Sequence, residues 1–365
     1  MFTQAAANRC IQAAVVSRTS IVRAASSGNP KTKNLPLSRG FLAGLHAHAT
    51  GVDHPEYDSF DSAYEAISQV PDNLLLEFEE ELLNGQGRKF IFGSRLVSVI
   101  DTTKDTDSTT LRTLVLNERP NLVQTAVIVP GPAGSQFTSD GAPSPITETH
   151  LGGLALALLF LPPPKPQSST SCVIVGAGGC TLPHTISRHI PRPSSVVALE
   201  PCEEVCTAAR KWFGITSDCG FQLISEFGEP YLSAQPAKSV NVLILDADDG
   251  SVPPKSMQTS KFWSDVIRPV LHDQGVVGVN VIGDEDTQLN LQDTLATSLP
   301  NYNITRVAAP VEADVDCSRH SLLFATPQTI DADDLEFKLR DCPVVSDAQA
   351  WLREIRNSQI IIKPI

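Results

Sequence analysis

The chain has 365 residues, of which 41% are hydrophobic, enough for one large or two modest folded domains. The net charge is −13, and the first 52 residues contain six basic residues and no acid, which leaves −19 for residues 53–365. So acidic a body argues against a nucleic-acid-binding protein, which needs a basic surface for phosphates. The longest apolar run, Leu151–Leu161, is too short to span a bilayer, so no membrane span is predicted.

Residues 1–52 are predicted to be a transit peptide and linker. They combine arginine and serine with an absence of acids, which is typical of organelle import signals. Arg23-Ala24-Ala25-Ser26 resembles a cleavage site of the mitochondrial matrix protease. Because the arginines are spread through the segment, the matrix is favoured over the plastid, which remains the alternative address. A terminal tail with no targeting role is the other interpretation.

Residues 53–147 are predicted to form N-terminal helices followed by a small antiparallel β domain. Two short helices are expected at Tyr57–Val70 and Pro71–Leu83. Alternating β-branched residues at Arg88–Ile100 and Thr110–Val129 indicate the strands of this domain.

Residues 148–365 are predicted to form a Rossmann-like α/β domain. A helix at Ile146–Leu161 leads into it, and strands then alternate with helical stretches, which predicts a parallel, doubly wound sheet. Helices are expected at Glu203–Phe213, Ser260–Leu271, Asp286–Leu299 and Ala348–Asn357, an antiparallel hairpin at Tyr302–Ala308 and Ser321–Ala325, and a β-rich tail at Ser358–Ile365.

Three strand ends of this domain carry the chemistry of a nucleoside-type cofactor site. The strand at Val173–Val175 runs into a turn with Gly176, Gly178 and Gly179, where the backbone can approach a ligand closely and the next helix presents free N–H groups. The second strand ends at Glu200, whose carboxylate can bind the two hydroxyls of a ribose. The third strand ends at Asp246, a candidate for binding an amine or taking its proton.

The other reactive residue types do not form a recognisable site. The eight cysteines contain no Cys-x-x-Cys pair and are expected to be structural, and no metal site is predicted. His150 and His184 are possible bases, although each is more typical of a structural histidine.

Several segments, taken in order, resemble the spermidine-synthase-like branch of the class I S-adenosylmethionine-dependent methyltransferases. They are most similar to the C-terminal domain of the elongation-factor lysine and N-terminal methyltransferases. The segments are the glycine turn with its Leu182-Pro183, Glu200 followed by Trp212-Phe213-Gly214, and Gly278-Val279-Asn280-Val281 after the second glycine turn, Asp273-Gln274-Gly275.

The resemblance implies a role for each candidate residue. The turn glycines would approach the methionine part of S-adenosylmethionine, and Glu200 would bind its ribose. Glu226 would contact the adenine amine, although the family usually has an aspartate there. Asp246 lies where the aminopropyltransferases keep their amine-activating aspartate.

Methyl transfer to a protein amine in mitochondria is the function this resemblance favours. Aminopropyltransferases hold the amine end of their cofactor with an aspartate in the glycine turn, where this chain has Cys180, and no polyamine-binding acids surround Glu148-Thr149-His150. A non-catalytic methyltransferase-like subunit or assembly factor of a mitochondrial complex remains the alternative. The expected partners are a protein substrate or the subunits of such a complex, with a homodimer as a further expectation.

Overall fold

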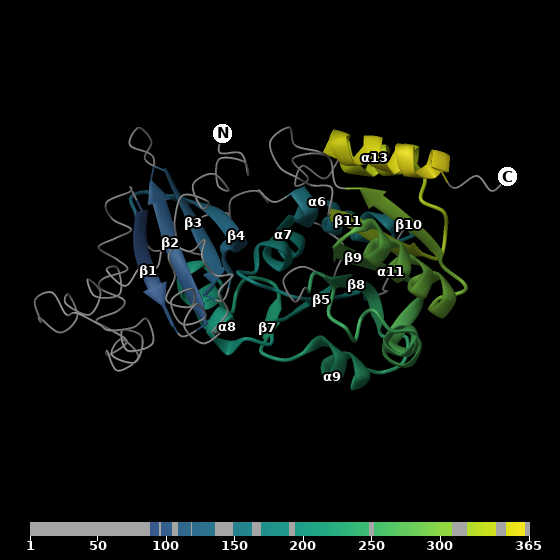
Figure 1. Ribbon diagram of the computed structural model, residues 1–365, viewed down its shortest axis with the longest axis horizontal. Coiled ribbons are helices and arrows are strands. Elements are labelled where there is room, and N and C mark those ends of the chain that lie inside the picture. Colours follow the sequence, from purple (N-terminus) through teal and green to yellow (C-terminus); the bar gives the residue numbers. More distant parts are fainter. Residues whose placement is uncertain are drawn as a thin grey trace, which may run out of the picture. The chain divides into compact units, whose positions relative to one another are not determined.

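The computed structural model describes residues 88–94, 96–103, 109–117, 119–135, 149–162, 169–189, 194–247, 252–308, 320–340 and 348–361. The predicted transit peptide and the two helices expected before residue 84 lie outside these ranges. The described residues fall into two compact units, one with strands β1 to β4 and one from helix α6 onward (Figure 1).

The first unit is an antiparallel sheet, as the alternating β-branched residues predict. Its strands are β1 (Arg88–Gly93), β2 (Val97–Thr103), β3 (Thr109–Leu116) and β4 (Arg119–Pro130), and they pair in chain order. Apolar side chains such as Val97, Val99 and Leu114 are fully buried in it.

A buried ion pair ties the loop after β4 to this sheet. The Arg112 and Asp101 side chains are both 0% exposed, and Nε and Nη2 of the arginine donate to the two carboxylate oxygens at 2.8 Å each. The Gly134 N–H donates to Asp101 Oδ2 at 2.7 Å, and Arg112 Nη2 donates to the Ser135 carbonyl at 2.7 Å. Each charge therefore has several partners, which offsets the cost of removing it from water.

The second unit contains a mostly parallel sheet, which confirms the predicted Rossmann-like class. Its strands run in the order β10-β11-β9-β8-β5-β6-β7. Strands β5 to β9 are parallel, and the β10–β11 hairpin closes one edge antiparallel to β9. The bounds are β5 (Ser171–Val175), β6 (Ser195–Leu199), β7 (Gln222–Ile224), β8 (Val240–Leu245), β9 (Leu271–Ile282), β10 (Asn303–Ala308) and β11 (His320–Thr326).

Helices connect these strands and cover both faces of the sheet (Figure 1). They are α6 (Thr149–Ala155), the 3₁₀ helix η2 (Leu156–Phe160), α7 (Thr181–His189), α8 (Glu203–Trp212), α9 (Gly228–Ser233), the π-helical segment η3 (Phe262–Ile267), α10 (Arg268–Val270), α11 (Glu285–Ser298), α12 (Ala332–Arg340) and α13 (Ala348–Ile361). Within the described residues, none of them is long and apolar enough to cross a membrane.

Three details differ from the sequence prediction. The helix expected at Ser260–Leu271 is present from Ser260 to Val270, but Phe262–Ile267 within it is π-helical and Leu271 already belongs to β9. The predicted turn Asp273-Gln274-Gly275 is an irregularity within β9, where the register against β8 shifts. The tail expected to be β-rich from Ser358 continues as helix α13 as far as Ile361.

Helix α6 lies very close to the last helix of the chain. A Cβ atom on Gly153 would lie 2.3 Å from Leu322 Cδ1 of β11 and 2.5 Å from Trp351 Cζ2 of α13. No other residue fits there without moving one of these two side chains. Trp351 is fully buried, so this contact fixes α6 against the sheet and α13.

Candidate functional site

The carboxyl ends of β5 and β8 meet at Gly176. This residue has φ +89°, and a Cβ atom on it would lie 2.2 Å from the Asp246 carbonyl oxygen. The Gly176 N–H donates to the Leu199 carbonyl of β6 at 2.9 Å, and the Asp246 N–H donates to the Val175 carbonyl at 2.8 Å. Only glycine combines this conformation with this close approach, so Gly176 brings the three predicted strand ends together. The strand order reverses here, which is where open α/β sheets bind ligands.

The glycine turn and Glu200 form one hydrogen-bonded unit. The Gly178 N–H donates to Glu200 Oε2 and the Cys202 N–H donates to Oε1, both at 3.1 Å. Burial raises the pKa of Glu200, and the two backbone hydrogen bonds act in the opposite direction. Each carboxylate oxygen retains a second lone pair, which can accept a ribose hydroxyl.

Cys180 ends the turn and immediately precedes α7. It has φ +68°, an uncommon conformation for a residue other than glycine, and its carbonyl accepts the His184 N–H at 3.1 Å. Burial is the main cause that raises the pKa of its thiol well above the usual range, so the turn carries no negative charge at this position. The next residue, Thr181, is buried, and its hydroxyl has no hydrogen-bond partner among the described residues.

Asp246 is surrounded by polar groups that the sequence did not connect to it. Asn280 of β9 donates from Nδ2 to Asp246 Oδ1 at 2.9 Å, and His150 Nε2 of α6 lies 3.9 Å from the same oxygen. Asn280 is 6% exposed, and its Oδ1 is a buried acceptor without a donor in the described part of the chain. In the sequence, the contact of Asn280 with Asp246 is signalled only by the position of Asn280 as the one amide in the apolar run Val276–Val281.

The remaining candidates occupy separate positions. Glu226 follows β7 at the same edge of the sheet, and its charge adds to burial in raising the pKa of Tyr231. Gly179 is buried within the turn. His184 is buried on α7, with its ring centroid 6.3 Å from that of Phe221.

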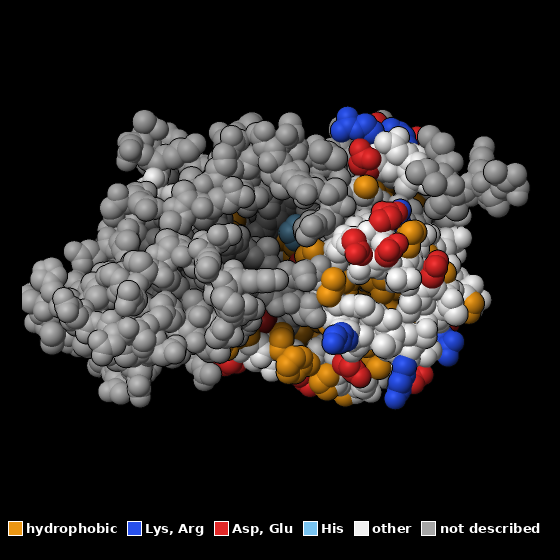
Figure 2. All heavy atoms as spheres, viewed as in Figure 1, with side chains coloured by type: hydrophobic (Ala, Val, Ile, Leu, Met, Phe, Trp, Pro, Cys, Tyr) orange, Lys and Arg blue, Asp and Glu red, His pale blue; other side chains and the backbone are white. Residues whose placement is uncertain are grey.

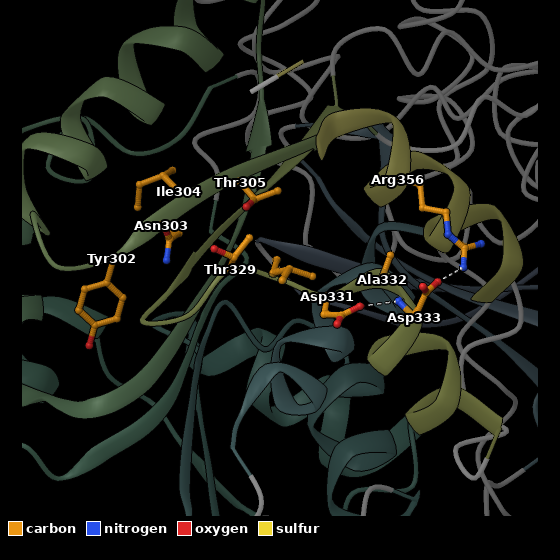
Figure 3. Close-up of a pocket in the computed structure, with 10 residues that line it drawn as sticks. Tyr302, Asn303, Ile304, Thr305, Thr329, Asp331, Ala332, Asp333 and Arg356 are labelled. Atoms are coloured by element: carbon orange, nitrogen blue, oxygen red, sulfur yellow. Dashed lines mark hydrogen bonds and ion pairs between the residues drawn. The ribbon is translucent and has the colours of Figure 1, made fainter. Parts of the chain in front are cut away.

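A cavity of about 1010 Å³ lies elsewhere, beside β10 and the start of α12 (Figure 3). Asn303 of β10 lines it and pairs with Thr326, toward the amino ends of the parallel strands and away from Asp246. Arg356 also lines the cavity, but it pairs with Asp333 at 2.8 Å and Glu336 at 2.9 Å. The arginine charge is thereby balanced, and the cavity shares no residue with the strand-end site. On the visible face of this unit, acidic and basic side chains are interspersed (Figure 2).

Comparison with known proteins agrees with the resemblance. No model of a known protein family matches the chain. The eEF1A lysine and N-terminal methyltransferase of Bos taurus is 28% identical over 212 residues, which cover 53% of this chain and 29% of that protein. The Homo sapiens protein is 26% identical over 211 residues, covering 53% of this chain and 30% of that protein. This chain therefore spans less than a third of the length of these relatives.

Among solved structures, a probable spermidine synthase from Corynebacterium glutamicum ATCC 13032 superposes with a TM-score of 0.52 at 15% identity. The match covers 69% of this chain and 87% of that chain, and it concerns the fold alone. Together with the sheet order, these matches confirm the resemblance drawn from the motifs. The chain is homologous over about half of its length to the eEF1A lysine and N-terminal methyltransferases and has a spermidine-synthase-like fold.

Proposed function

We propose that the chain is an S-adenosylmethionine-dependent methyltransferase that acts on an amine of a protein in mitochondria. The observation that carries the proposal is the pair of acceptors at the end of β8. The Asp246 backbone contacts the Gly176 turn, Asn280 of β9 donates to the Asp246 side chain, and the buried Asn280 Oδ1 has no donor among the described residues. The N–H groups of an amine would supply one, because a buried acceptor left without a donor is costly.

The chain also fits the cofactor. The first turn of α7 offers backbone N–H groups, which favour a carboxylate. The Thr181 hydroxyl is a further unsatisfied group beside them, and Glu200 can accept the ribose hydroxyls. Because Cys180 is uncharged, nothing in this turn would prefer the cationic amine end of a decarboxylated cofactor. These contacts support methyl transfer over aminopropyl transfer.

The proposed roles of the residues are positional. The bound cofactor supplies a methyl group that its sulfonium already activates. Asp246 would orient the accepting amine so that the amine nitrogen faces the reacting carbon. Asn280 donates to Asp246 Oδ1 and thereby holds this carboxylate in place. An amine attacks only when it is neutral, so an acceptor for its proton is also needed.

Calorimetry and methyl transfer test this proposal directly. The purified chain should bind S-adenosylmethionine more tightly than its decarboxylated form, and it should transfer labelled methyl to a protein of a mitochondrial extract. Asp246→Asn should retain cofactor binding and lose transfer. If the chain binds neither form, the proposal is wrong. Spermidine formation from putrescine and the decarboxylated cofactor would contradict the proposed reaction type.

The mitochondrial address is tested separately, by following a chain that lacks residues 1–40. The segment has no acids, as import signals require, so its removal should abolish import. A truncated chain that still reached the matrix would contradict the proposed address.

A non-catalytic subunit is the second candidate, favoured by one observation. Both oxygens of Glu200 already accept backbone N–H groups, so this carboxylate has a structural role without any cofactor. A purified chain that binds neither S-adenosylmethionine nor its decarboxylated form would support this candidate.

A further inference from the structure

The proposed function requires a destination for the proton that the accepting amine loses. His150 lies beside the candidate carboxylate of the acceptor site, with its Nε2 atom 3.9 Å from Asp246 Oδ1. The His150 side chain is 25% exposed and that of Asp246 16%, so the imidazole is the more open of the two to water. Asn280 donates to the same Asp246 oxygen and thereby fixes the carboxylate next to the ring.

Ordinary acidities show why a carboxylate alone is a poor proton acceptor here. A lysine ammonium has a pKa of about 10.4 and an aspartic acid about 3.9, a difference of roughly 6.5 units against proton transfer. An imidazole, with a pKa of about 6.5, reduces the difference to about 4 units. Transfer to the imidazole is therefore about 400-fold more favourable than transfer to an ordinary carboxylate.

We propose that His150 receives the proton of the accepting amine, with Asp246 carrying it from the amine to the ring. The amine nitrogen gives one proton to the Asp246 carboxylate and keeps its lone pair for the methyl group. The carboxylate passes the proton to His150 Nε2, and the imidazolium releases it to water. The distance of 3.9 Å must shorten for the second transfer, as catalytic hydrogen bonds do when substrate binds. This inference rests on the proposed function, because it takes an amine as the acceptor.

Several elements surround helix α6. It packs against η2, α7, β9 and β11 and, at Gly153, against Trp351 of α13. In the described part of these elements the titratable or charged residues are His184 and Arg188 on α7, with His189 at its end, His272 and Asp273 at the start of β9, His320 at the start of β11, and Arg353, Glu354 and Arg356 on α13. His150 Nε2 lies 3.9 Å from Oδ1 of Asp246, the residue that follows β8.

The proposal and a purely structural ion pair differ in whether Nε2 of the neutral His150 ring carries a hydrogen. If His150 accepts a proton from Asp246, Nε2 of the neutral ring must be free of hydrogen. If the ring only stabilises Asp246, Nε2 carries the hydrogen and donates it to the carboxylate. The two states give pyridine-type and pyrrole-type ¹⁵N signals, which NMR distinguishes.

The test is a pH titration by NMR of the full chain with ¹⁵N-labelled histidine. His150→Gln assigns the signal, and His272→Gln serves as the matched control. Wild type should show a pyridine-type Nε2 above the titration midpoint of the ring. In Asp246→Asn the midpoint should fall by at least half a pH unit, because a carboxylate at this distance favours the protonated ring.

A pyrrole-type Nε2 in the neutral ring, or a midpoint that Asp246→Asn leaves unchanged, would overturn the proposal. Adding S-adenosylmethionine to the same samples separates this inference from the proposed function. A wild-type chain without any cofactor-induced shifts would contradict the proposed function, whereas the state of Nε2 decides the role of His150 in either case.

Discussion

Replacing Glu200 tests the proposed cofactor site most directly. Glu200 is only 9% exposed, and its carboxylate accepts hydrogen bonds from the N–H groups of Gly178 and Cys202 at 3.1 Å each. One lone pair on each carboxylate oxygen is thereby left for the ribose hydroxyls. A hydrogen bond to a charged group contributes about 1.5–3 kcal/mol. Glu200→Gln retains one acceptor and should lose one such interaction, about 10- to 150-fold in affinity. Glu200→Ala loses both and should bind more weakly still.

Calorimetry with S-adenosylmethionine measures these affinities, and thermal unfolding with ligand provides an independent check. At a ligand concentration 100 times the wild-type Kd, binding stabilises the wild type by about 2.7 kcal/mol. A variant weakened 10-fold keeps only about 1.4 kcal/mol of that stabilisation. Glu203→Gln is the matched control, because this glutamate on α8 is 68% exposed and should leave affinity unchanged. If Glu200→Ala binds as tightly as wild type, the ribose is held elsewhere and the reasoning is refuted.

Three further predictions concern stability. Gly176→Ala should lower the free energy of unfolding by denaturant by about 2–5 kcal/mol, because residue 176 has φ +89° and its new Cβ would lie 2.2 Å from a backbone oxygen. Gly220→Ala is the control: its φ is +78°, but the nearest neighbour of its Cβ would be 3.4 Å away, so it should cost only about 1–2 kcal/mol. Arg112→Met should destabilise the antiparallel sheet by about 3–5 kcal/mol and speed its amide exchange, and adding Asp101→Leu should restore most of that loss. Burial raises the pKa of Glu200 in the folded state. The stability that its protonated form contributes is therefore present below pH 4.5 and is lost as pH rises through the folded-state pKa. Between pH 4.5 and 7, the free energy of unfolding of Glu200→Gln should fall less than that of the wild type.

The sequence predicted the elements whose chemistry is local. The glycine turn after β5, the acid after β6 and the acid after β8 are each encoded within a few residues, and the rule that parallel strands end at one edge brings them together. The structure adds that the turn and Glu200 are directly hydrogen-bonded.

The parts that the sequence could not predict depend on distant contacts. Asn280 reaches Asp246 only because β9 pairs with β8 in a register that shifts near its start, and the sequence does not specify that register. Ile360 and Ile361 are β-branched and favour a strand by propensity, yet α13 continues through both, as tertiary context often dictates.

The close contact between Gly153 and Trp351 links the two ends of this unit. His150 lies one turn before Gly153 on α6, so the candidate acid–base site depends for its placement on a tryptophan about 200 positions later in the chain. Shortening the protein from its carboxyl end, by proteolysis or by an early stop codon, would remove a wall of α6 long before it reached any residue of the site. Under the proposed function, such a product would lose methyl transfer through a displaced histidine while keeping every residue proposed to contact the cofactor.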